Sequence, residues 1–311
     1  MGKRMGKGEK DILYGILSER NIKHIQFGID KRFPSWYGSN AYFNLETRLL
    51  GFKEDQRVVK KVERCQFWLD TLYICEYCFK YTDDEEQYIA HEANCKYKGR
   101  APGKIMYKSP TYTIRRVKGS KHQLFCQCLC LFTKLFLDNK SMYFKVDHYE
   151  FYIVYETEST KPMGFFSKDL VSYQQNNLAC ILTFPPYQRR RLGSLLLEFS
   201  YELSKSEGIL SGPELPLSPF GLISYLKYWS KVICYELTTG ELANFGRLTL
   251  EDIATVSGMR IQDIILTLKY LNCLGESNDI YLTPLKNNLK KYGSKRNDIF
   301  SLEEEYLLID G

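Results

Sequence analysis

The chain has 311 residues, of which 44% are hydrophobic and 26% are charged. These proportions are typical of globular proteins and exclude a chain that is disordered throughout. Lys and Arg number 43 against 37 Asp and Glu, a net charge of +6. This mild basic excess is compatible with a nucleic-acid or chromatin neighbourhood without requiring one. The length favours two or three modules.

Ten cysteines are the unusual feature of the composition. An even count permits disulfides, but no apolar stretch of signal-peptide type follows the N-terminal MGKRMGKGEK. Thiols of a protein that is not secreted stay reduced, so we expect metal ligands, core residues or catalytic groups. No apolar run approaches the roughly 18 residues of a membrane span. We therefore expect a soluble intracellular protein without membrane contact, and the charge favours the nucleus.

Strands are predicted where apolar residues alternate or run continuously, at 22–29, 66–74, 148–156, 162–167 and 178–184. The last of these, LACILTF, is continuously apolar, as expected of a central strand. Residues 53–64 are charged and predict a solvated connection, whereas residues 99–119 show no clear periodicity.

Helices are predicted where apolar residues recur every three or four positions. Residues 124–136 predict a buried helix, and the stripe over 192–203 predicts an amphipathic helix that Gly208 ends. In the last third, apolar residues flank Gly258 in the pattern of two short helices around a turn, and a polar SND follows at 277–279. This pattern predicts a helix-turn-helix with a small wing.

The cysteine cluster reads C-x2-C-x12-H-x3-C and comprises Cys75, Cys78, His91 and Cys95. Zinc prefers four tetrahedral N or S ligands, and a helix over 88–95 would place the His and the last Cys on one face. A redox CxxC would need neither of these two residues. Buried thiols beside a surface histidine remain the alternative. A closed set of four ligands indicates a structural zinc that stabilises a small segment.

An acidic stretch in the finger and a second cysteine run further along the chain also bear on function. The acidic DDEEQ at 83–87 is poorly suited to phosphate contact. The CQCLC run at 126–130 lies on the apolar helix, where cysteines act as small hydrophobic side chains, so we expect packing and not a second metal site.

The segment 178–204 runs from a strand through a proline break and an arginine-rich loop into a helix. Free N–H groups and the dipole at a helix N-terminus make an anion site suited to a pyrophosphate. An ordinary turn with a solvated arginine run is the alternative, and the segment alone does not decide between them.

This segment resembles the acetyl-CoA motif of the MYST histone acetyltransferases, Q/R-x-x-G-x-G/A, within the GCN5-related fold. RNIKHIQFG at 20–28, LYICEYCFKY at 72–81 and LTLEDIATVSGMRIQDIILTLKYL further along resemble the same family in order. The match extends from about residue 12 over nearly the whole chain. Among family members the chain most resembles the catalytic subunit of a complex that acts in silencing.

The resemblance implies an α+β fold, with a GCN5-related acyltransferase-like core, an N-terminal C2HC zinc finger and a C-terminal helix-turn-helix or winged-helix-like region. It implies these divisions: a flexible basic tail at 1–11, an N-terminal segment at 12–63, the finger at 64–100, the acetyl-CoA-binding core at 101–220 and the C-terminal region at 221–311.

The resemblance also assigns site residues. Glu214, in SGPELPLS, matches the base that removes the proton of the lysine, and Cys180 matches a cysteine proposed as a transient acetyl acceptor. We favour direct attack, because the neighbours Ala179 and Ile181 offer no cation that would activate the thiol. Lys140 matches a lysine that the family acetylates on itself. The residues that match cofactor contacts are Ile181, Leu182, Thr183, Gln188, Arg189, Arg190, Arg191, Leu192, Gly193, Ser194 and Ser218.

Arg191 departs from the signature, because it stands where the first glycine belongs. Glycine permits positive φ and a close approach of the backbone to phosphate. The arginine would either clash with the cofactor or bind its pyrophosphate through the guanidinium. We expect Arg191→Gly to raise acetyl-CoA affinity if the clash is real.

The resemblance therefore predicts a nuclear histone lysine acetyltransferase that uses acetyl-CoA and structural Zn²⁺, acts on the histone H4 tail at position sixteen, and assembles with partner subunits. Two alternatives remain. One is a cofactor-impaired scaffold or chromatin-binding subunit, because of Arg191. The other is a DNA-binding protein built on the finger and the helix-turn-helix, to which the basic stretch 286–296 would contribute weak DNA contact.

Overall fold

The computed structural model describes residues 16–17, 20–44, 48–51, 67–137, 144–275, 279–293 and 296–309. The predicted basic tail, the charged connection at 53–64 and Lys140 lie outside these residues. Contacts between Cα atoms divide the chain into two compact units, of which the first is 1–103, 117–149 and 158–162 and the second is 104–116, 150–157 and 163–311. Among the described residues, no helix is long and apolar enough to cross a membrane.

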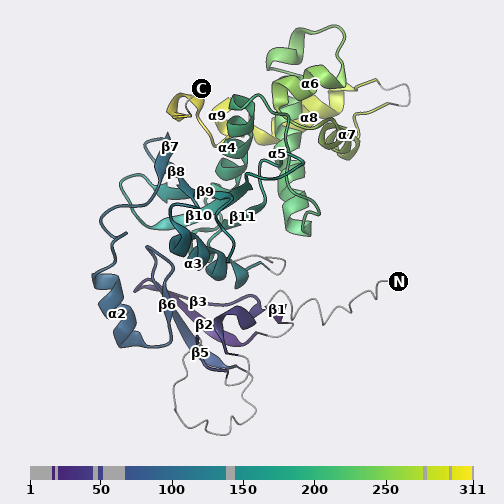
Figure 1. Ribbon diagram of the computed structural model, residues 1–311. Coiled ribbons are helices and arrows are strands. Elements are labelled where there is room, and N and C mark those ends of the chain that lie inside the picture. The colour runs from purple at the N-terminus through teal and green to yellow at the C-terminus, as the bar shows by residue number, and fades with distance from the viewer. Residues whose placement is uncertain are drawn as a thin grey trace. The chain divides into compact units, whose positions relative to one another are not determined.

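The first unit contains a four-stranded sheet in the order β3-β2-β5-β6, formed by Lys31–Pro34, Ile22–Phe27, Leu69–Ile74 and Tyr81–Thr82. A two-stranded ribbon pairs β1 (Ile16–Leu17) with β4 (Gly38–Ser39), and a short turn η1 (Asn40–Tyr42) follows. Two helices belong to this unit, α2 (Glu85–Ala93) and α3 (Gln123–Lys134) (Figure 1). The predicted strands at 22–29 and 66–74 and the predicted helix at 124–136 are confirmed.

The core of the first unit lies where α3 packs on aromatic side chains of the sheet. The ring of Phe27 stacks on that of Phe132, with centroids 4.9 Å apart, and Phe79 lies 5.5 Å from the same ring. The three cysteines of CQCLC on α3 are buried, and burial raises the pKa of Cys128 to about 11. These thiols are therefore inert core residues, as the sequence predicts.

The second unit contains a five-stranded sheet in the order β11-β10-β9-β8-β7, so that β11 is an edge strand. Its strands are Cys180–Thr183, Pro162–Asp169, Tyr149–Glu156, Tyr112–Lys118 and Lys104–Lys108, a few end residues of which are assigned to the first unit. The three strands predicted between 148 and 184 are confirmed. The hairpin of β7 and β8 was not predicted, because a register shift between Ile105 and Tyr107 breaks the alternation that reveals a strand.

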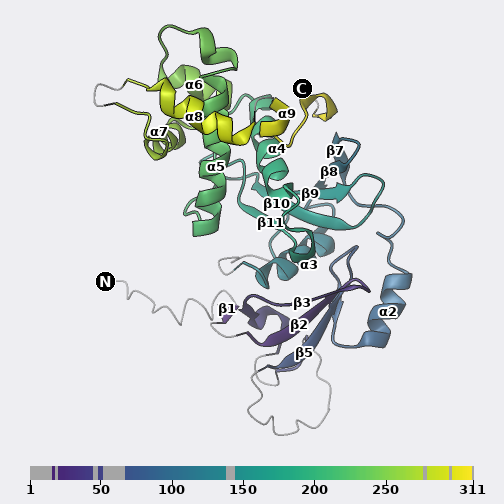
Figure 2. The same cartoon turned by 180° about the vertical axis from the view of Figure 1, so that it is seen from behind.

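The helices of the second unit are α4 (Leu192–Ser206), α5 (Pro219–Glu236), α6 (Leu250–Ser257), α7 (Ile261–Tyr270), α8 (Leu282–Tyr292) and α9 (Arg296–Ile299), with short turns η2 (Pro185–Tyr187), η3 (Glu241–Asn244) and η4 (Glu304–Tyr306). Helices α6, α7 and α8 all contact α5, and Figure 2 shows them grouped around it. Gly208 follows α4 at φ +70°, as predicted for its end.

The two short helices predicted around Gly258 are observed as α6 and α7. Thr249 caps α6 in a capping box with Asp252, and Gly258 ends it at φ +70°. An antiparallel bridge between Leu274 and Ile280 follows where the small wing is predicted. Helix α5 was not predicted from periodicity. Its last two turns are buried on nearly every side, so its apolar residues do not form one stripe.

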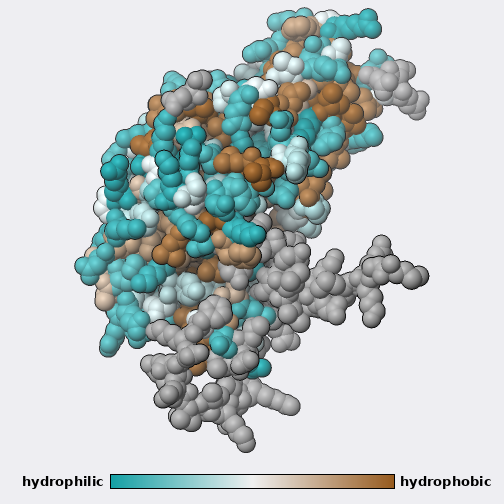
Figure 3. Space-filling model, viewed as in Figure 1, coloured by the Kyte–Doolittle hydropathy of each residue, from teal (hydrophilic) through white to brown (hydrophobic). Residues whose placement is uncertain are grey.

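The surface of the second unit carries apolar side chains beside charged ones. Phe220 and Ile223, in the first turns of α5, are 84% and 65% exposed. Figure 3 shows brown hydrophobic surface interspersed with teal in the region of α5 and the helices that contact it.

Candidate active site and metal centre

The metal centre is a cluster of Cys75, Cys78, His91 and Cys95 in the first unit. One ligand atom from each lies within 4.8 Å of every other, and the Cys78 Sγ is 3.2 Å from the His91 Nε2. Burial and the nearby Lys80 lower the pKa of His91, which keeps the imidazole neutral and able to bind a metal. Three thiols and one imidazole are the donor set of a structural zinc site, so the residues fit Zn²⁺.

The structure corrects one detail of the predicted finger. Helix α2 ends at Ala93, and the N–H of the capping residue Asn94 bonds the His91 carbonyl. His91 therefore lies on the helix, whereas Cys95 lies just past its end and not on the same helical face. The chain turns after the helix and still brings the Cys95 thiol to the other three ligands.

Strand β11 presents backbone groups at the edge of its sheet. It pairs with β10 in register, with Leu182 opposite Phe165, and the N–H of Phe184 bonds the Met163 carbonyl at 3.0 Å. Along an antiparallel ladder, every second pair of opposite residues is hydrogen-bonded. Phe184 bonds Met163, so Leu182, two residues earlier, forms a hydrogen-bonded pair with Phe165. The backbone N–H groups of Ile181 and Thr183 then face the edge that no other described strand covers.

Cys180 begins β11 and is half-buried, opposite Ser167 of β10. Its thiol is not part of a disulfide. The strand therefore carries the predicted acetyl-acceptor candidate and presents the N–H groups of Ile181 and Thr183 at its edge, whereas the Leu182 N–H is directed to β10.

The arginine run between β11 and α4 is a tight turn. Arg189 and Arg191 both adopt left-handed conformations, at φ +65° and +60°. Arg190 forms an ion pair with Glu156, with 3.0 Å between nitrogen and oxygen, and its guanidinium lies 5.6 Å from the ring of Tyr187. The Gln188 side chain donates to the Thr183 carbonyl at 3.4 Å, which connects the turn to the end of β11.

Helix α4 begins directly after this turn, with Arg191 as its N-terminal capping residue. Its first intrahelical bond joins the Leu195 N–H to the Arg191 carbonyl at 3.1 Å, so the N–H groups of Leu192, Gly193 and Ser194 have no acceptor within the helix. Leu192 is buried, and a Cβ added at Gly193 would meet only the Thr183 Oγ1, at 3.7 Å. This geometry suits a bound anion.

The Arg191 side chain extends to the C-terminal part of the second unit. Its guanidinium donates to the Ile299 carbonyl at 3.2 Å, and the Lys231 ammonium donates to the same carbonyl at 2.7 Å. This contact is neither of the two outcomes that the sequence suggested for the arginine.

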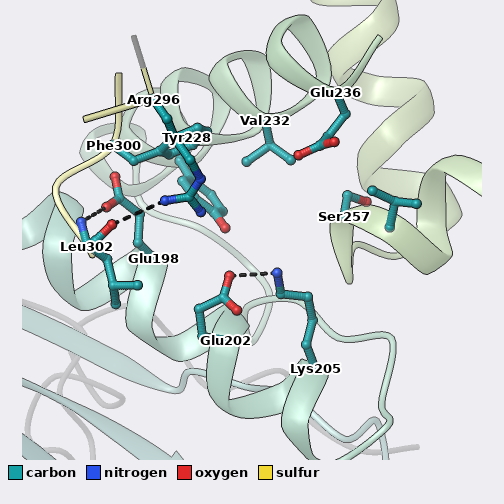
Figure 4. A pocket seen from close by; sticks show the side chains of 11 residues that line it. Glu198, Glu202, Lys205, Tyr228, Val232, Glu236, Ser257, Arg296, Phe300 and Leu302 are labelled. Atoms are coloured by element: carbon teal, nitrogen blue, oxygen red, sulfur yellow. Dashed lines mark hydrogen bonds and ion pairs between the residues drawn. The ribbon is translucent and has the colours of Figure 1, made fainter. Parts of the chain in front are cut away.

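The buried Glu198 of α4 holds the backbone that follows Ile299. One of its carboxylate oxygens accepts the N–H groups of Ser301 and Leu302, at 2.7 and 2.8 Å. Burial raises the pKa of Glu198 to about 7. Figure 4 shows this carboxylate at a small pocket of about 40 Å³ that Arg296, Phe300 and other residues line. No motif marked Glu198 in the sequence, because its partners are backbone groups about a hundred residues away.

Glu214 lies on a segment that runs beside the start of β11. Its N–H bonds the Leu178 carbonyl at 2.9 Å, and Leu178 pairs with Pro213 in a parallel bridge. Glu214 is exposed. The structure thus brings the base candidate to the strand that carries Cys180, although 34 positions separate them in the numbering.

Ser218 caps α5. Its hydroxyl accepts the Gly221 N–H at 3.1 Å, and Pro219 occupies the first helical position. This capping role accounts for the residue in structural terms. Its predicted cofactor contact stays a prediction.

Comparisons with known proteins agree with this arrangement. Residues 100–307 match the model of the MOZ/SAS family. The chain is 67% identical over 307 residues to the histone acetyltransferase SAS2 of Saccharomyces cerevisiae, covering 99% of this chain and 90% of that protein. It is 41% identical over 206 residues to the histone acetyltransferase MOF of Drosophila melanogaster, covering 66% and 24%. It is 36% identical over 254 residues to the histone acetyltransferase ESA1 of Gibberella zeae, covering 81% and 46%.

Proposed function

Since the chain belongs to the MOZ/SAS (MYST) family of histone acetyltransferases, we propose that it transfers the acetyl group of acetyl-CoA to a lysine of the histone H4 tail, at position sixteen, in chromatin silencing. The family match confirms the resemblance predicted from the sequence, the mixed α+β class and the use of acetyl-CoA. The Cys3His cluster supports a structural zinc. The tail position, the silencing role and a nuclear location are part of the proposal.

The observation that carries the proposed mechanism is the 2.9 Å bond from the Glu214 N–H to the Leu178 carbonyl. It holds the base candidate beside the strand on which we place the thioester. A substrate lysine has a pKa of about 10.4 and must lose a proton before it can attack. The exposed Glu214 carboxylate accepts that proton, and the neutral amine then attacks the carbonyl carbon of the thioester. The new C–N bond forms as the C–S bond breaks, and CoA leaves as the thiolate.

The outward-facing N–H groups of β11 are suited to stabilise the oxyanion that forms in this attack. The turn from Gln188 to Ser194 would hold the pyrophosphate with its backbone N–H groups and the N-terminus of α4. In this mechanism Cys180 is adjacent to the cofactor and is not a nucleophile. The core is, in our proposal, of the GCN5-related type, and the C-terminal module is winged-helix-like.

The cofactor-impaired scaffold finds less support than the enzyme. Arg191 adopts φ +60°, the conformation that a glycine would supply, and its guanidinium is engaged by the Ile299 carbonyl. The turn therefore keeps the form that the signature requires. We further propose that the chain acts with partner subunits of a complex like SAS (something about silencing), as its likeness to SAS2 suggests, and that any DNA contact through 286–296 is weak.

The test is acetyl transfer to nucleosomes and to free histones, with and without partner subunits. We expect Glu214→Gln to lose most of the activity and Cys180→Ser to keep most of it. Glu251→Gln, which changes an exposed carboxylate on α6, is the matched control and should retain full activity. The opposite ranking of Glu214 and Cys180 would reject direct attack. No transfer by the wild type with any partner would favour the scaffold.

A further inference from the structure

The segment that leads into Glu214 lies between two other parts of the second unit. On one side Leu178 bridges Pro213, and the Asn177 N–H bonds the Gly212 carbonyl at 3.0 Å. On the other side Ser211 forms a parallel bridge with Met259, and its N–H bonds the Gly258 carbonyl at 3.0 Å. The second flank is the turn of the helix-turn-helix.

Arg260, the capping residue of α7, connects both flanks through its side chain. One terminal nitrogen of its guanidinium donates to the Gln174 carbonyl at 2.7 Å and to the Asn176 Oδ1 at 2.8 Å. The other lies 3.5 Å from the Pro213 carbonyl, the residue immediately before Glu214. A rigid planar guanidinium can serve several acceptors with fixed geometry, which a lysine cannot.

Close packing beneath the same segment adds a second constraint. A Cβ added at Gly212 would lie 2.5 Å from the buried Asp263 carboxylate and 3.5 Å from the Arg260 guanidinium. The helix-turn-helix therefore approaches the backbone of 211–213 too closely for a side chain at Gly212. Hydrogen bonds from a charged donor are stronger than those between neutral groups, so the contacts of Arg260 can decide the conformation of this segment.

We propose that Arg260 is a positioning residue for Glu214, and that the turn of the helix-turn-helix serves acetyl transfer by fixing the segment 211–214 against 174–178. This inference rests on the proposed function of Glu214 for its catalytic consequence. Its structural part, the fixing of the loop, does not depend on activity.

The first experiment measures hydrogen exchange of the full chain. In Arg260→Ala we expect the Glu214 N–H, which bonds the Leu178 carbonyl, to exchange at least tenfold faster, because the loop opens more often. Arg247→Ala, an exposed arginine before α6, is the matched control and should leave this exchange unchanged. Unchanged exchange in Arg260→Ala would overturn the proposal, whether or not the protein transfers acetyl groups.

The second experiment separates positioning from general destabilisation. We expect Arg260→Ala to lower kcat about tenfold while the KM for acetyl-CoA changes less than threefold, and Arg260→Lys to restore part of kcat. In a Glu214→Gln background the same substitution should change kcat less than twofold, since no base remains to be positioned. An equal loss in both backgrounds would overturn the proposal.

Failure of the proposed function and misfolding of Arg260→Ala can each be told apart from failure of the positioning proposal. If the wild type transfers no acetyl group, the proposed function fails, and if Glu214→Gln stays active, the proposed role of Glu214 fails; in both cases the exchange result alone decides the positioning. If Arg260→Ala does not fold, Asn176→Ala removes a single acceptor of the guanidinium. It should then raise exchange at Glu214, and no rise would overturn the proposal.

Discussion

Replacing Arg191 tests whether the turn that we propose for the cofactor is strained. A residue other than glycine at φ +60° costs about 1–2 kcal/mol, and the bond to the Ile299 carbonyl returns about 1 kcal/mol. Arg191→Ala loses the bond and keeps the strain, so we expect it to be about 1 kcal/mol less stable than the wild type. Arg191→Gly loses the bond and also the strain. The greater conformational entropy of its unfolded state then lowers its stability by about 0.4–1 kcal/mol.

The glycine variant should therefore be more stable than the alanine variant by about 0.5–1 kcal/mol. In thermal unfolding this corresponds to about 1–4 °C for a unit of this size. The matched control is Lys290, an exposed residue inside α8, where glycine should be less stable than alanine by about 0.8–1.0 kcal/mol. If glycine were less stable than alanine at both positions, the left-handed conformation of Arg191 would be refuted.

The same variants decide whether the arginine obstructs the cofactor. We expect Arg191→Gly to bind acetyl-CoA more tightly if the side chain clashes with it. Calorimetry that gives unchanged or weaker binding would reject the clash and leave the contact with Ile299 as the role of the side chain.

Three further predictions concern other parts of the chain. Gly193→Ala should fold as well as the wild type, because its Cβ meets only the Thr183 Oγ1 at 3.7 Å, but its acetyl-CoA Kd should rise at least tenfold; an unchanged Kd in calorimetry would argue against the proposed pyrophosphate turn. Burial raises the pKa of Glu198 from 4.5 to about 7, so the folded chain holds a proton that the unfolded chain releases, and stability should fall as pH rises through this window. Glu198→Gln should remove this part of the pH dependence of thermal unfolding, and an unaltered profile would contradict the assignment. Metal analysis should find one zinc per chain, lost in Cys95→Ser and kept in the control Cys128→Ser, and loss of zinc from both variants would count against the Cys3His site.

The elements that the sequence predicts well are those with an undisturbed period. The strand containing Cys180 is a continuous apolar run, and the helices around Gly258 have clear stripes, the first of them with capping signals at both ends. The hairpin at 104–118 escaped prediction because its bulge shifts the alternation by one residue. Helix α5 escaped because its last two turns are buried on nearly all sides and leave no stripe to detect.

The site also contains local features that the sequence reveals and long-range contacts that it does not. The spacing of the four metal ligands is local, so it could be found from the sequence. The conformation of Arg191 could be anticipated from the glycine that it replaces, but its bond to the Ile299 carbonyl spans 108 residues. Likewise, the bond from Arg260 to the Gln174 carbonyl spans 86 residues. Contacts of this kind depend on tertiary packing, and no pattern in one sequence encodes them.

The bond between Arg191 and the Ile299 carbonyl has a consequence for the order of folding. Strands β10 and β11 pair across a short connection, whereas this bond closes a loop of 108 residues. Closing so long a loop costs entropy before any contact stabilises it, so contacts of this range form late. The sheet that presents the edge strand would then form first. The turn that we propose for the cofactor would acquire its last contact only when the segment around Ile299 docks, so cofactor binding would report on the final step of folding.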